Sequence, residues 1–76
     1  MPPKLPRISG EGTISVLLRL GFVVSRQRGS HVILRKKTSA GDVGCVVPLH
    51  RELAIGTLRS ILRQAGVSPE EFIENL

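Results

Sequence analysis

The sequence predicts a small α+β domain, a two-layer sandwich in the order α-β-β-β-α with a short C-terminal helix. Apolar residues have helical spacing near both ends of the chain, at Ile14, Leu17 and Leu18 and again between Ile55 and Ala65. Three β-branched segments separated by turn residues lie between these helices. Strands joined by short connections usually pair antiparallel, and two apolar helix faces need one sheet face to cover. We therefore expect a three-stranded antiparallel sheet with one open face.

The chain has 76 residues, which is enough for one domain. We place this domain at residues 9–76 and expect an extended N-terminal arm over residues 1–8. Pro2, Pro3 and Pro6 disfavour a helix in that arm.

The first helix is predicted to begin after Ser9, whose side chain can cap it, and to end at Gly21. Pro48 ends the last strand because proline cannot donate to the strand ladder. The three strands are expected at residues 22–26, 30–37 and 43–47, with turns at residues 27–29 and 38–42.

The second helix has an apolar face and ends at Gly66. Ser68 can cap a last short helix, with Pro69 at its first position and Glu71 completing a capping box. Three apolar residues at the end of the chain can fold back onto the core: Phe72, Ile73 and Leu76.

The formal net charge is +5, which favours a polyanionic partner such as nucleic acid, anionic lipid or an acidic protein. The alternative is that the basic charge only aids solubility. No apolar segment is long enough for a signal peptide or a membrane span, so we expect a cytoplasmic protein. Cys45 with two histidines does not make a convincing zinc site, and we expect no metal and no cofactor. The setting of Cys45 is typical of a buried, inert thiol.

His31 is the strongest candidate for chemistry. Side chains alternate along a strand, so Val32 and Leu34 share the core side while His31 belongs with Ile33 and Arg35 on the open face. A neutral imidazole can accept a proton and return it later. The alternative is ordinary, since a single histidine at a strand start is more often structural or merely exposed. Basic residues crowd this neighbourhood: Arg26, Arg28, Arg35, Lys36 and Lys37.

The acidic residues are scattered and form no set suited to a two-metal nuclease. RNA carries its own nucleophile, the 2′-hydroxyl, so a metal-free enzyme need only move protons and stabilise charge on the phosphate. Arg59 and Arg63 share one face of the second helix and can contact phosphate, or form an ordinary solvated face. His50 can contact phosphate or supply a second proton, although a structural role is the better interpretation.

The chain resembles the HicA family over nearly its whole length from Ser9. The Gly-Ser-His turn, followed at this spacing by Pro-x-His and Gly-Thr-Leu, is specific as a set. The matching segments are Leu20-Gly21-Phe22, Arg26-Gln27-Arg28-Gly29-Ser30-His31, Val47-Pro48-Leu49-His50, Gly56-Thr57-Leu58 with the helix that follows to Gly66, and Glu70-Glu71-Phe72.

The resemblance implies a toxin of a type II toxin–antitoxin system with a fold like the double-stranded-RNA-binding domain. It implies an endoribonuclease that cuts mRNA, with His31 as the catalytic residue and a HicB-like antitoxin as partner. Gly29 would then allow the tight turn and Ser30 would help to orient the site, with His50 in support. The residues expected to bind RNA are Arg26, Arg28, Arg35, Lys37 and Arg59.

Two other functions remain open at the level of sequence. A non-catalytic double-stranded-RNA-binding module would share the order of elements and the charge, and would bind duplex RNA with strong salt dependence. An adaptor would use its basic face only to dock a protein.

Overall fold

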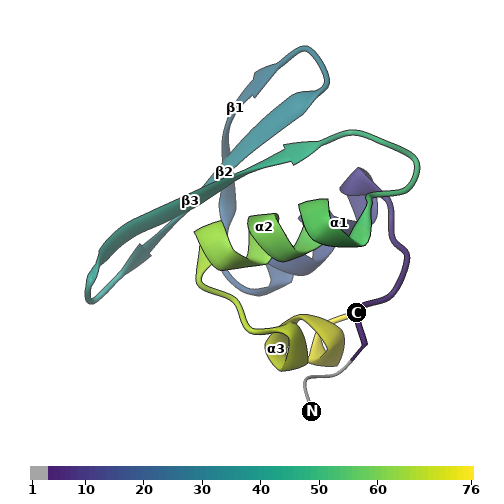
Figure 1. The fold of residues 1–76 in the computed structure, drawn as a ribbon. Helices are drawn as coiled ribbons and strands as arrows, with labels where there is room; N and C mark the ends of the chain where they lie inside the picture. Colours follow the sequence, from purple (N-terminus) through teal and green to yellow (C-terminus); the bar gives the residue numbers. More distant parts are fainter. Residues whose placement is uncertain (1–3) are drawn as a thin grey trace.

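The computed structural model describes residues 4–76, and the predicted order of elements is confirmed (Figure 1). The first three residues of the expected arm, with Pro2 and Pro3, lie outside the described part of the chain. The elements are α1 (Gly10–Arg19), β1 (Val23–Arg28), β2 (His31–Thr38), β3 (Gly41–Pro48), α2 (Ile55–Ala65) and α3 (Pro69–Glu74).

The strands form one antiparallel sheet in the order β1-β2-β3, so β2 is the central strand. Both α1 and α2 contact the sheet through β3, and Figure 1 shows α3 beyond α2, near the point where the chain finishes. The two-layer α+β architecture is confirmed, and one face of the sheet is left without a helix.

The core lies between the sheet and the helices. Leu34 from β2 and Val47 from β3 are fully buried against Leu17 of α1 and Leu58 of α2. Phe72 of α3 closes the far end and is also fully buried. The expectation that Leu76 folds back was wrong, because its side chain is 56% exposed at the end of the chain.

Helix α1 buries Leu17 and packs Ile14 against the core as predicted, but its buried face is rotated away from Leu18. Leu18, expected on the apolar face, is 47% exposed, whereas Val16 and the polar Thr13 are buried beside Leu17. Thr13 is tolerated inside because its hydroxyl donates to the backbone carbonyl of Ser9 at 2.9 Å. Counting apolar residues alone therefore predicted a buried face that includes Leu18 and omits Thr13 and Val16.

Three predicted helix ends are confirmed, while α1 ends at Arg19, two residues before the predicted Gly21. The Ser9 hydroxyl accepts a hydrogen bond from the Gly12 amide at 2.9 Å, and the Ser68 hydroxyl accepts one from the Glu71 amide at 3.1 Å. Helix α2 ends at Gly66, which has a left-handed conformation. Each cap satisfies a backbone group that the helix itself leaves unpaired.

The first and third strands are longer than predicted, the second is shifted by one residue, and both turns are shorter. Strand β1 continues through Gln27 and Arg28, so only Gly29 and Ser30 connect it to β2. The second connection is also reduced to two residues, 39 and 40, since Gly41 already pairs with Thr38. Polar residues were mistaken for turns because a strand with no helix over it carries the same polar composition as a loop.

The segment before α1 is part of the domain. Leu5 is buried in the core, and the carbonyl of Ile8 accepts a hydrogen bond from the Leu53 amide at 2.8 Å. An exposed ion pair between Arg7 and Glu52, at 3.2 Å, joins the same two segments. Residues 4–8 thus have no helix or strand, as expected for an arm, but they pack against the loop before α2.

Candidate functional site

His31 begins β2 and is exposed, while the next residue, Val32, is buried. The alternation continues through half-buried Ile33, buried Leu34 and exposed Arg35. The helices therefore cover the face that carries Val32 and Leu34. We call the other side, which carries His31, Ile33 and Arg35, the open face.

The turn before His31 is held in shape by its own residues. Gly29 has φ +58°, a left-handed conformation that glycine adopts without strain. Glycine at the first position of a two-residue hairpin loop with positive φ suits the II′ turns that hairpins favour. The side-chain amide of Gln27 donates to the Gly29 carbonyl at 3.0 Å. The sequence placed Gln27 in a turn without giving it a role. Its position two residues before Gly29 was the feature that could have indicated this hydrogen bond.

This turn is also attached to the end of β3. The carbonyl of Ser30 accepts a hydrogen bond from the Leu49 amide at 2.7 Å. Gly10 of α1 lies directly against the Pro48 carbonyl, where a side chain would have no room, and its amide donates to the His50 carbonyl at 2.9 Å. Because Pro48 is the register partner of His31, the start of α1, the end of β3 and the histidine form one connected unit.

Positive side chains share the open face with His31. Arg28 is its direct partner across the β1–β2 ladder, and Arg26 is the partner of Ile33 two residues further along. Paired residues in an antiparallel ladder point to the same side, so both arginines belong to the open face. By alternation along β2, Arg35 and Lys37 follow.

Lys36 differs from the other cations near His31. It belongs to the helix side by alternation, and its ammonium lies 5.7 Å from the centre of the Phe22 ring. That distance is within the range of a cation–π contact. Lys36 therefore covers the end of the core as well as adding charge.

Two of the predicted residues lie apart from the open face. Arg59 is exposed on α2, in the helix layer on the other side of the sheet. His50 is exposed in the loop after β3, where it lines a hollow of about 340 Å³ together with Ser9, Glu11 and Arg51. The structure thus gathers the cations of β1 and β2 around His31 and leaves Arg59 on a separate surface.

Cys45 is buried on the helix side of the sheet, where it pairs with Leu34. Burial raises the pKa of the Cys45 thiol to about 11, so the thiol is protonated and inert at neutral pH, as its sequence setting predicted. Within residues 4–76, no three side chains of His, Cys, Asp or Glu come close enough together to hold a metal ion. No helix in this described part is long and apolar enough to cross a membrane.

A comparison with protein families places this small basic domain in a class. The model for toxins of bacterial toxin–antitoxin systems matches residues 11–67, more than half of the 76-residue chain. The chain belongs to the HicA toxin family, which confirms the resemblance drawn from its motifs. The match covers α1 from its second residue, the whole sheet and α2. A comparison with curated proteins finds no match.

Proposed function

We propose that this HicA toxin is an endoribonuclease that cleaves mRNA without a metal ion, with His31 as its general acid/base. The observation that carries the proposal is the position of one exposed imidazole on the open face, opposite Arg28 and on a rigid turn. Catalytic groups need such fixed positions, because a loosely held base loses the benefit of orientation.

RNA supplies its own nucleophile, so the protein need only transfer a proton and stabilise negative charge. His31 takes the proton of a ribose 2′-hydroxyl, and the 2′-oxygen attacks the adjacent phosphorus. The bond from phosphorus to the 5′-oxygen breaks and a 2′,3′-cyclic phosphate is left. The 5′-oxygen takes a proton from a water molecule, and the His31 imidazolium returns its proton to that water, so that the neutral imidazole is restored. Proton transfer of this kind contributes roughly 10²–10⁴-fold to a rate.

The nearby cations act on the charge that develops during this step. Arg28, directly opposite His31, is the residue best placed to stabilise the phosphorane, and Arg26 follows it on the same face. Gly29 and Ser30 keep the turn in position, and His50 supports the loop beside it. Arg35 and Lys37 bind phosphates further along the strand, while Arg59 contacts RNA only if the strand passes around to the helix layer.

The test compares purified wild type with His31→Ala on a defined mRNA, with chelator present throughout. We expect a fall in cleavage of roughly 10²–10⁴-fold in the variant, and loss of growth arrest when the variant is induced in cells. Because His31 is exposed, its replacement leaves the core intact, which circular dichroism checks. Imidazole added to the variant should restore part of the cleavage, which a purely structural role would not allow.

Two results would overturn the proposal. Unchanged cleavage by a folded His31→Ala protein would remove this residue from catalysis, and loss of wild-type cleavage in chelator would remove the metal-free mechanism. A wild type that cleaves no RNA but binds duplex RNA with strong salt dependence would instead support the non-catalytic double-stranded-RNA-binding module.

The partner of the toxin also belongs to this proposal. A HicB-like antitoxin that covers the open face would block access to His31, and acidic side chains on that protein would complement Arg26, Arg28 and Arg35. Mixing the toxin with its antitoxin should therefore stop cleavage, and the protection should weaken at high salt because exposed charges are screened.

A further inference from the structure

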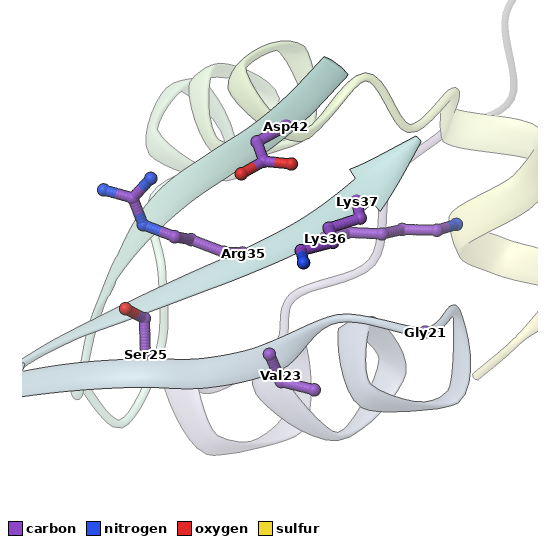
Figure 2. A pocket seen from close by; sticks show the side chains of 7 residues that line it. All are labelled: Gly21, Val23, Ser25, Arg35, Lys36, Lys37 and Asp42. Carbon is purple, nitrogen blue, oxygen red and sulfur yellow. The ribbon is translucent and has the colours of Figure 1, made fainter. Parts of the chain in front are cut away.

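A hollow of about 390 Å³ lies on the open face, towards the end of β2 away from His31 (Figure 2). All three strands contribute to it: Val23 and Ser25 from β1, Arg35 and Lys37 from β2, and Asp42 from β3. Figure 2 shows these side chains around the strands, with the helices behind the sheet. Its volume falls in the range of sites for small organic ligands.

The hollow exists because β1 is shorter than β2 and carries an irregularity. Strand β1 begins at Val23 opposite Arg35, so the rest of β2 continues with no strand on that side. The register then shifts between Val24 and Arg26, which leaves Ser25 as an extra residue. Such bulges re-aim a side chain and are frequent beside functional sites.

The lining is chemically mixed. Arg35 and Lys37 are positive on the open face, Lys36 adds positive charge from the helix side, Asp42 is a carboxylate and Ser25 supplies a hydroxyl. Val23 adds an apolar surface that is 62% exposed. In the part of the chain that the structure describes, the one ion pair is Arg7 with Glu52, so Asp42 makes no direct ion pair in the hollow, and the cations there outnumber it.

A ligand for this lining needs three properties at once. It carries negative charge for the lysines and the arginine, a hydroxyl or amine that donates to Asp42, and an apolar face for Val23. Inorganic phosphate has only the first property and is repelled by the carboxylate. A nucleotide of RNA has all three, since its 2′-hydroxyl is a donor that acidic side chains recognise in ribose.

We infer that the hollow is a nucleotide subsite for the RNA strand whose cleavage is proposed above, with Asp42 accepting from a ribose 2′-hydroxyl. Arg35 lies four residues after His31 on the same face, which is about 13 Å along a strand. The nucleotide held there is therefore separated from the cleaved bond by a few nucleotides along the RNA strand. The inference rests on the proposed function for the identity of the ligand.

The test uses fluorescein-labelled single-stranded oligoribonucleotides that grow by one nucleotide at a time, bound to His31→Ala protein and followed by anisotropy. Affinity should rise in one distinct step once the RNA reaches the hollow. Arg35→Gln should abolish this step and reduce the slope of log Kd against log salt by about 0.7. Lys4→Gln, an exposed charge on the N-terminal segment, is the matched control and should leave the step in place.

A second arm addresses Asp42. A single 2′-deoxy substitution is walked along the longest oligonucleotide, and at one position it should weaken binding several-fold. That loss should disappear in Asp42→Ala, because the variant has no side-chain oxygen to accept a hydrogen bond from the hydroxyl, and persist in the control Glu74→Ala. Glu74 is an exposed carboxylate at the end of α3.

The outcomes separate this inference from the proposed function. If wild type cleaves RNA but affinity shows no step and no effect of Arg35→Gln, the subsite is wrong and the cleavage proposal stands. If wild type cleaves nothing, the binding arms still decide the subsite. If a polyglutamate peptide binds in an Arg35-dependent manner more tightly than every oligonucleotide, the hollow docks a protein and the inference is wrong.

Discussion

The two faces of the sheet are made by alternate residues of the same strands, yet they have opposite properties. On the covered face, Val32, Leu34 and Val47 are buried against the helices. On the open face, His31 and Arg35 are exposed, and Val46 is 42% exposed. The difference teaches that folding and the proposed chemistry depend on separate sets of residues. The open face can carry unneutralised positive charge because the stability of the domain comes from the other side.

The largest effect is expected from breaking the covered face. Leu34→Ala removes a side chain that is fully buried at the centre of the core and should cost about 2–5 kcal/mol in the free energy of unfolding. That is a large share of the roughly 4–11 kcal/mol typical of a domain this size. Urea denaturation measures the change.

The matched control is the neighbour on the open face. Ile33→Ala removes a half-buried side chain and should cost only about 1 kcal/mol. Equal losses for the two variants would mean that the open face contributes as much to stability as the covered one, and the comparison would fail.

A smaller effect is expected at the turn that positions His31. Gly29→Ala meets no neighbouring atom, so its cost comes only from the positive φ and should be about 1–2 kcal/mol. Gly29→Asn should cost less, because asparagine tolerates this conformation. Thermal unfolding ranks the variants. If Gly29→Ala and Gly29→Asn destabilise the protein equally, backbone strain at this position is not the cause of the lost stability.

The smallest effect at neutral pH concerns Cys45, on the covered face. Burial raises the pKa of its thiol from about 9 to about 11, so the folded state holds this proton more tightly than the unfolded chain. The stability that this contributes is complete below pH 9 and is lost as the pH rises towards 11.

Comparison with Cys45→Ala isolates this titration from that of the lysines. The difference in unfolding free energy between wild type and the variant should be constant up to about pH 8.5 and should then shift against wild type. Iodoacetamide should also leave the folded wild type unmodified at pH 8, since the buried thiol is protonated there. Rapid alkylation without unfolding would show that Cys45 is accessible.

The elements that the sequence predicted well have strong local signals. Ser9, Gly66 and the Ser68-Pro69 pair mark helix ends by the chemistry of single residues, and the buried alternation of Val32 and Leu34 follows from the strand repeat. These features need no knowledge of distant contacts, which is why they could be derived before the structure.

The features that were missed depend on distant contacts. The burial of Leu5 depends on packing by residues far along the chain, and the polar end of β1 at Arg28 is identified only by its pairing with His31. In the candidate site, the strand repeat correctly placed His31 on the open face. It gave no indication of the bulge at Ser25, of the distance in space between Arg59 and His31, or of Lys36 over Phe22.

The docking of the N-terminal segment affects how the protein can be shortened. The stretch that matches the family model, residues 11–67, leaves out both Leu5 and Phe72, which are buried in the hydrophobic core. A fragment cut to the family limits would open two voids and strip the backbone partner from Leu53. The region matched by the family model and the residues that form the packed core therefore have different boundaries in this molecule, and we expect the shorter fragment to be less stable than the full chain.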